Sequence, residues 1–213
     1  MSVKKMLSLL LVFAVTVLSV PLAGITRAFA SDLDLLSYRS INENTEIEIT
    51  DCDVSASGAL EIPSTIEGLP VKSIGFAAFR SCASLTGIII PEGVTNIGEY
   101  AFQGCTSLTG ITVPAGAECI DRFAFYGCTA LNYITLSGGI TKIGASAFAN
   151  TGYYNNTANW QDNVLYIGSY LIRAEADDIN GSYTVLTWTS CIADNAFFGC
   201  GYLTGITLPA GVV

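Results

Sequence analysis

The sequence contains no histidine among its 213 residues. This absence excludes Ser-His-Asp triads and the H-E-x-x-H zinc motif, and it removes one of the principal ligands of zinc. The G-x-S-x-G motif of serine hydrolases is absent as well. A glycosidase needs only two carboxylates, so the 18 acidic residues leave that chemistry formally open. We expect no enzymatic activity and no cofactor.

Basic residues are scarce, with 9 Lys and Arg against 18 Asp and Glu, and the formal net charge is −9. A negative surface repels the phosphate backbone of nucleic acids and the headgroups of anionic lipids. Nucleic acid is therefore not an expected partner. We also expect no attachment to a membrane except through an anchor that lies outside this chain.

Only one long hydrophobic run is present, from Met6 to Val20. Its 15 residues are fewer than the roughly 20 that a membrane-spanning helix needs. Two lysines precede the run, and Ala28-Phe29-Ala30 matches the A-x-A cleavage pattern. Residues 1–30 are therefore predicted to be a signal peptide cleaved before Ser31, with a single membrane anchor as the alternative. Cleavage would remove three basic residues and no acidic one, which takes the net charge to −12.

A 23-residue repeat dominates the rest of the chain. The first three units, 71–93, 94–116 and 117–139, follow one another without a gap. A fourth unit spans 140–188 with 26 additional residues, and a fifth spans 189–211. Two of the ladders of equivalent residues are Ile74, Ile97, Ile120, Ile143 and Ile192, and Phe79, Phe102, Phe125, Phe148 and Phe197. A regular repeat of this length predicts a solenoid.

The spacing within one unit indicates its local structure. Leu108-x-x-Ile111-x-Val113 places two side chains on the same face of a strand. Pro114 and Gly116 then end the strand and turn the chain. The Gly-x-x-Ala-Phe segment is predicted to form a compact turn, either 3₁₀ or a short helix. One unit buries too little apolar surface to fold alone, so the units must stack.

These motifs resemble the BspA-type leucine-rich repeat of bacterial surface proteins. The pattern A-F-x-x-C-x-x-L-x-x-I-x-I-P is matched by residues 101–114 and again by 196–209, and the segment 60–71 is similar to the usual lead-in. The likeness covers about residues 38–213, and it departs from the pattern at Ser137, Asp121, Ala193 and Thr151. The resemblance implies a right-handed leucine-rich-repeat solenoid, with strands and short 3₁₀ or helical turns. It also implies an adhesin-like role without a catalytic motif.

Three parts of the chain are predicted. Residues 1–30 form the signal peptide, residues 31–70 form an N-terminal cap and lead-in, and residues 71–213 form the repeats. The alternation around Ile41 to Thr50 predicts a hairpin strand that covers the first coil. No polar capping unit follows the fifth repeat, so we expect that the chain is truncated at its C-terminus or that another element covers this end.

The 26 additional residues of the fourth unit are rich in aromatic side chains, whereas the outward strand positions are mostly small. A hairpin that turns at Gly168-Ser169 is predicted within them. Insertions in solenoids often build binding surfaces, although this one can also pack only on its own neighbours. The candidate ligand contacts are Tyr133, Tyr153, Tyr154 and Trp160.

Four cysteines share one inward repeat position: Cys82, Cys105, Cys128 and Cys200. Adjacent coils are close enough for disulfides, but parallel Cβ vectors about 4.8 Å apart favour a ladder of buried free thiols. Asp51-x-Asp53 and Asp177-Asp178 lack the spacing of a calcium loop and are read as solvated turn residues. We therefore expect no metal site.

Two functions are compatible with the sequence. The first is a secreted or cell-surface binding and adhesion module, whose partner is an extracellular protein or a cell-surface glycan. The second is a structural spacer or targeting arm of a larger secreted protein that has its catalytic domain elsewhere.

Overall fold

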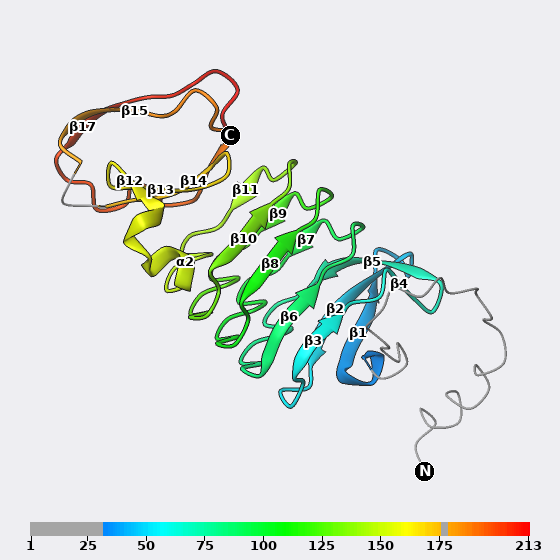
Figure 1. The fold of residues 1–213 in the computed structure, drawn as a ribbon. Coiled ribbons are helices and arrows are strands. Elements are labelled where there is room, and N and C mark those ends of the chain that lie inside the picture. Colours follow the sequence, from blue (N-terminus) through cyan, green and yellow to red (C-terminus); the bar gives the residue numbers. More distant parts are fainter. Residues whose placement is uncertain (1–31, 176–178) are drawn as a thin grey trace, which may run out of the picture.

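The computed structural model describes residues 32–175 and 179–213, which form a solenoid of about seven turns that repeat about every 23 residues (Figure 1). The predicted signal peptide, residues 1–30, lies outside the described residues. The expected leucine-rich-repeat solenoid is confirmed.

Two pairs of parallel strands follow from the L-x-x-I-x-I segments and lie along one side of the coils. The pairs are β3 (Gly58–Glu61) with β6 (Leu85–Ile89), and β8 (Gly110–Val113) with β10 (Tyr133–Leu136). In each strand one set of alternate side chains points into the core, and the other set faces outward. Strand β3 pairs with β6 in parallel, so the segment expected as a lead-in is already a coil of the solenoid.

A parallel sheet runs along the opposite side of each coil, at the isoleucine ladder. The repeat pattern predicts this ladder but not its strands. They are β5 (Leu69–Ile74), β7 (Asn96–Ile97), β9 (Cys119–Ile120) and β11 (Lys142–Ile143). The short strands pair in register, with Ile74 beside Ile97 and Ile97 beside Ile120. This sheet and the two strand pairs therefore share one apolar interior.

The segments that contain the Ala-Phe pair, such as residues 98–105, connect the two sides of the coils and are called Ala-Phe turns below. The expectation of a 3₁₀ or helical turn is wrong for the regular coils, because a left-handed residue, Tyr100 with φ 58°, interrupts any helical run. Alternate N–H groups take different partners. Ala101 and Gln103 donate within their own turn, to Gly98 and Tyr100. Tyr100, Phe102 and Gly104 donate to the carbonyl oxygens of Arg122, Ala124 and Tyr126 in the next coil.

The phenylalanine ladder fills the centre of the core. Phe79, Phe102, Phe125 and Phe148 are buried, and each ring stacks on the next with centroids 5.0 to 5.3 Å apart. Ala101 and its equivalents are buried beside these rings. The small side chain allows the backbones of adjacent coils to approach within hydrogen-bonding distance.

A hairpin closes the N-terminal end, as the alternation predicted. A 3₁₀ turn, η1 (Leu33–Leu35), leads into β1 (Leu36–Ile41), which pairs antiparallel with β2 (Glu46–Cys52). The turn between them is left-handed at three successive residues, from Asn42 to Asn44. Strand β2 pairs in parallel with β5, and the two-residue strand β4 (Thr65–Ile66) also pairs with β5. The hairpin thus covers the edge that the first coil would otherwise expose.

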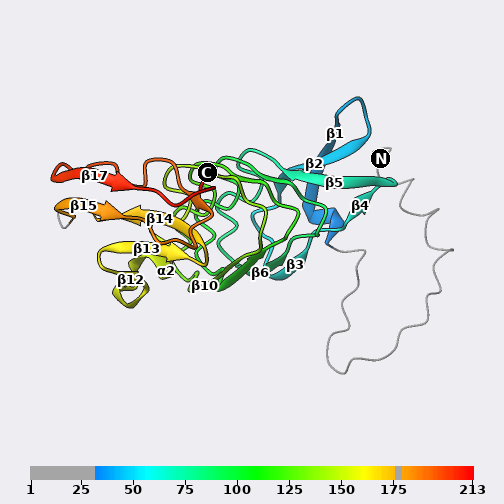
Figure 2. The same ribbon diagram turned by 90° about the horizontal axis from the view of Figure 1, so that it is seen from above.

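The additional residues of the fourth unit form a further coil of the stack, which corrects the expectation of one long interrupted repeat (Figures 1 and 2). The segment begins with α2 (Gly152–Asn155), η2 (Thr157–Asn159) and β12 (Trp160–Gln161). The hairpin of β13 (Val164–Ile167) and β14 (Tyr170–Ala174) turns at Gly168, as predicted. The inserted coil, described for residues 168–175 and 179–188, includes β14 and β15 (Gly181–Thr184).

At the isoleucine ladder the fifth repeat lies between the fourth unit and this inserted coil: the N–H of Asp194 donates to the carbonyl oxygen of Ile143 at 2.7 Å, and that of Ala193 donates to Leu171 at 2.9 Å. Strand β16 (Cys191–Ile192) pairs in parallel with β14, and β17 (Leu203–Thr207) pairs in parallel with β15. The insertion has nearly the length of one repeat, which is why it fits into the stack as a coil. Ile206 and Leu208, on the last coil, are exposed.

Candidate functional site

The outward face of β6, β8 and β10 carries two large exposed apolar side chains on a floor of small residues. The outward positions are Gly87, Ile89, Gly110, Thr112, Tyr133 and Thr135, as the alternation predicts. Ile89 is 53% exposed and Tyr133 is 77% exposed. Each side chain stands on a strand of a parallel pair, Ile89 on β6 beside β3 and Tyr133 on β10 beside β8, so their positions are held by the hydrogen-bonded backbone beneath them.

A shallow groove of about 550 Å³ lies over these strands and is called the strand groove below. Ile89 and Tyr133 line it together with Gly87 and Gly110. A Cβ atom added at Gly87 would lie 3.4 Å from the Cβ of Ala59, and one added at Gly110 would lie 3.5 Å from the Cβ of Tyr133. Side chains at either glycine would therefore fill part of the groove. Among the described residues, Glu92 is the one charged residue that lines it.

The three aromatic candidates of the insertion form a separate cluster. Tyr154 and Trp160 meet edge to face, with ring centroids 5.2 Å apart. The Trp160 Nε1–H donates to the carbonyl oxygen of Tyr154 at 2.8 Å, and the Tyr153 hydroxyl donates to that of Tyr166 at 3.0 Å. All three are half-buried, and burial raises the pKa of both Tyr153 and Tyr154.

This cluster holds α2 and β12 against the core, so its side chains have a structural role that the sequence did not separate from binding. Tyr154 and Trp160 also line an open hollow with Asp162 and Glu175. Tyr133 does not line that hollow; it lines the strand groove instead. The four predicted contacts are therefore divided between two surfaces. Replacing all three cluster residues with alanine would remove core packing as well as any ligand contact.

The strand groove could have been found from the sequence by giving more weight to the strand alternation. Ile89 and Tyr133 stand out in it because the other outward positions are glycine or threonine. A separate cleft lies between the Ala-Phe turn of the fourth unit and residues 193–198. No feature of the repeat pattern predicts this cleft. It arises from the way the inserted coil stacks.

The cysteines are free thiols, as the ladder geometry predicted. Cys82, Cys105 and Cys128 are buried, whereas Cys200 on the last coil is half-buried. The Cys105 thiol donates to the carbonyl oxygen of Phe79 at 3.1 Å, and that of Cys128 donates to Phe102 at 3.0 Å. The ladder thus ties neighbouring coils together through S–H···O bonds.

Carboxylates and thiols do not gather into a metal site in the described parts of the chain, where no group of three or more potential ligands occurs. Asp53 accepts a hydrogen bond from the backbone N–H of Ser55 at 2.8 Å. Hydrogen bonding by the backbone and the side chain of Ser55 lowers the pKa of the Asp53 carboxyl group. Asp53 is therefore a turn residue, as predicted. Asp177 and Asp178 lie outside the described residues. Among residues 32–175 and 179–213 no helix has the length and apolarity to cross a membrane.

Comparisons with known proteins agree with this architecture. The BspA type Leucine rich repeat region matches in six copies over residues 58–176. A leucine-rich-repeat protein of T. pallidum is similar over 83% of this chain and 81% of its own, with 27% identity and a TM-score of 0.57. One from Bacteroides ovatus is 28% identical with a TM-score of 0.53, and the match covers 84% of this chain and 41% of that one. No curated protein matches the sequence.

Proposed function

Because the chain belongs to the BspA-type leucine-rich-repeat family, we propose that it is a secreted or cell-surface protein that binds an extracellular partner and catalyses no reaction. The observation that carries the proposal is the strand groove, in which Ile89 and Tyr133 project from rigid parallel strands. The partner is an extracellular protein or a cell-surface glycan that covers these two side chains.

Exposure of the two side chains supports a binding role. Neither fills the core, and an exposed tyrosine gains free energy when a partner buries its ring and satisfies its hydroxyl. Between them the glycines leave room for a partner's side chain or sugar ring. Such a concave surface with a few polar groups is the usual form of a ligand site.

The charge of the molecule restricts the partner. With a net charge of −9, the protein favours neutral or basic surfaces and disfavours polyanions, including nucleic acids. In the described part of the chain, the groove itself carries only the charge of Glu92. Contact there would therefore depend mainly on apolar burial and hydrogen bonds, and its affinity would change little with salt.

The proposal is tested by surface plasmon resonance against immobilised extracellular-matrix proteins and cell-surface glycans. For a partner that binds, Tyr133→Ala is expected to weaken binding at least about tenfold, the effect of losing one aromatic anchor. Ile89→Ser should weaken it in the same direction. The matched control is Phe76→Ala, which removes an exposed aromatic side chain outside the groove.

Equal binding by folded Tyr133→Ala and Phe76→Ala proteins would remove the groove from the proposal. Loss of binding in a Trp160→Ala protein that remains folded, with Tyr133→Ala unaffected, would move the site to the aromatic cluster of the insertion. Failure of the folded protein to bind any member of the panel would instead favour a spacer or targeting arm.

A further inference from the structure

The Ala-Phe turns leave a regular row of N–H groups pointing toward the next coil. Phe123 donates to the carbonyl oxygen of Ala145 at 3.2 Å, and Phe125 donates to that of Ala147 at 2.8 Å. Tyr100 and Phe102 make the equivalent bonds one coil earlier, at 3.2 and 2.7 Å. Each coil therefore requires acceptors from the turn of the coil that follows it.

This row ends at the fourth unit. Ser146 and Phe148 occupy the positions of Phe123 and Phe125, but the inserted coil that follows has no Ala-Phe turn. Within residues 32–175 and 179–213, no group accepts a hydrogen bond from the N–H of Ser146 or of Phe148. Ser146 is exposed, whereas Phe148 is buried, and a buried N–H without an acceptor costs free energy.

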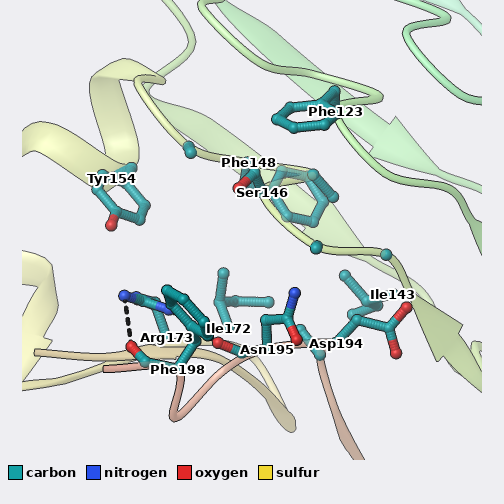
Figure 3. A pocket seen from close by; sticks show the side chains of 15 residues that line it. Phe123, Ile143, Ser146, Phe148, Tyr154, Ile172, Arg173, Asp194, Asn195 and Phe198 are labelled. Atoms are coloured by element: carbon teal, nitrogen blue, oxygen red, sulfur yellow. Dashed lines mark hydrogen bonds between the residues drawn. The ribbon is translucent and has the colours of Figure 1, made fainter. Parts of the chain in front are cut away.

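A cleft of about 370 Å³ occupies the place of the missing turn (Figure 3). Phe123, Ser146 and Phe148 form one wall. The other wall is formed by Arg173, Asp194, Asn195 and Phe198. Tyr154 stands at one end of the cleft. The cleft is distinct from the strand groove, with which it shares no lining residue.

Arg173 donates hydrogen bonds to carbonyl oxygens of the second wall, but it provides no acceptor for the N–H groups of the first wall. Its guanidinium donates to the carbonyl oxygens of Asn195 at 2.8 Å and Phe198 at 2.9 Å. In a regular coil the oxygen at the position of Phe198 accepts from a backbone N–H of the preceding turn, as that of Gln103 does from Ser81. The N–H of Ala174 also donates to the carbonyl oxygen of Ala196 at 2.8 Å, so the inserted coil serves this turn through one backbone N–H and the arginine side chain. Among the described residues, the unmet requirement in the cleft is for acceptors, on the side of Ser146 and Phe148.

The aromatic ladder on the surface also ends at this cleft. The ring of Phe123 stacks on that of Tyr100 with centroids 5.2 Å apart and an interplanar angle of 1°. The next position of the ladder is Ser146, whose side chain is too small to cover the other face of Phe123. An apolar or aromatic side chain that entered the cleft would extend this stack.

The geometry points to the cleft as a second binding site, which takes a peptide segment of a partner protein in the place of the missing turn. A main-chain carbonyl oxygen of the peptide accepts from the N–H of Ser146, and a carbonyl two residues further on serves Phe148. An aromatic side chain of the peptide lies on Phe123. Main-chain pairing of this kind gives affinity, and the side-chain position gives specificity.

Charge favours a peptide over a free anion as the occupant. Arg173 is already engaged by two carbonyl oxygens, Asp194 also lines the cleft, and the whole chain carries a net charge of −9. Neutral carbonyl groups meet the two N–H donors without this repulsion. Carbonyl groups two residues apart in an extended peptide point to the same side, so they match the spacing of the N–H groups of Ser146 and Phe148. A single anion does not match this spacing.

The test titrates the ¹⁵N-labelled protein with a heptapeptide that copies residues 121–127, acetylated and amidated at its ends. In the solenoid the carbonyl groups of this segment accept from the turn before it. We expect saturable downfield shifts of the Ser146 and Phe148 amide protons, with smaller shifts in residues 193–198. A parallel titration with chitotetraose examines the glycan class.

Two matched variants locate the site. Ser146→Tyr places a ring over Phe123, and Tyr100 shows that tyrosine is accommodated at this position with the same φ of 58°. It should weaken the peptide at least about tenfold. Ala77→Tyr adds the same ring at the equivalent position of the first unit, with φ 54°, and should leave binding unchanged.

Several results would overturn the inference. One is a folded protein without saturable shifts at millimolar peptide. Another is equal peptide binding by the Ser146→Tyr and Ala77→Tyr proteins. Shifts confined to the strand groove, or shifts of the Ser146 amide with chitotetraose and not with the peptide, would also reject it. None of these outcomes affects the strand-groove proposal, because its variants and probes are separate.

Discussion

The rings of Phe102 and Phe125 stack face to face, with centroids 5.1 Å apart and planes within 5° of parallel. The two residues lie one repeat apart, at equivalent positions of adjacent coils. The same backbone path repeated at a short spacing leaves no other arrangement for two large planar side chains. The Phe ladder is thus a direct consequence of the 23-residue period.

Replacing Phe102 with alanine should open a cavity in the middle of this ladder. Phe102 is buried and has a stacked neighbour on both sides, so we expect a loss of about 3–5 kcal/mol in the free energy of unfolding. Urea denaturation measures the change. The exposed Phe76→Ala variant is the control and should lose about 1 kcal/mol or less. Equal stability of the two variants would contradict the assigned core.

The thiols of the cysteine ladder should be free but inaccessible in the folded protein. Titration of the denatured, unreduced protein with Ellman's reagent should detect at least the four ladder thiols: Cys82, Cys105, Cys128 and Cys200. In the native protein Cys105 and Cys128 should react only after unfolding, because both are buried. Detection of a single thiol after denaturation would mean that the ladder is bridged by disulfides.

Alkaline pH should destabilise the fold partly through Cys119. Burial, with help from the nearby Asp121 carboxylate, raises the pKa of this thiol from about 9 to about 11. The folded state therefore favours the protonated thiol. Its contribution to stability is complete below about pH 9 and is lost as the pH rises through 11.

We expect the Cys119→Ala variant to lose less thermal stability than the native sequence between these pH values. Melting temperatures followed by circular dichroism from pH 8 to 11 measure the difference. Tyrosines and lysines that do not interact with Cys119 also titrate in this range, but they are common to both proteins and cancel in the comparison. Lys142, whose pKa is raised by Asp121 and also by Cys119, interacts with the thiol, so its change is part of the measured difference. Parallel curves would exclude a contribution from this thiol.

The break in the row of turn hydrogen bonds should be visible in hydrogen exchange. The amides of Tyr100 and Phe123 both donate to the next coil at 3.2 Å, whereas that of Ser146, at the equivalent position, has no acceptor in the described parts of the chain. We expect Ser146 to exchange much faster than the other two. Equal protection at all three positions would show that the wall of the cleft is closed in solution.

Several features of the fold could be predicted because they depend on residues that recur at a fixed period. The strands at Ile111 and its equivalents, the inward Phe and Cys ladders, and the capping hairpin follow from local alternation and from the repeat. The strands at the isoleucine ladder were missed because two residues, such as Asn96-Ile97, are too short for an alternation pattern to be recognised.

The candidate site depended more on packing. Among the four predicted aromatic contacts, Tyr133 is exposed on a strand, whereas Tyr153, Tyr154 and Trp160 are held against the core by hydrogen bonds and ring contacts. The sequence shows that all four are aromatic, but exposure depends on which surfaces face each other after folding. Composition alone cannot separate an anchor for a ligand from an anchor for a loop.

The sequence by itself determined the solenoid, its period and the identity of the core, because each coil repeats one set of apolar positions and can bury them only against its neighbours. The tertiary structure alone decided that the insertion would become a coil and that the described part of this coil would lack an Ala-Phe turn. It also decided that Arg173 would donate hydrogen bonds to only one wall of the cleft. These outcomes depend on hydrogen bonds between segments far apart in the chain, and no local pattern of residues specifies which donors will find an acceptor.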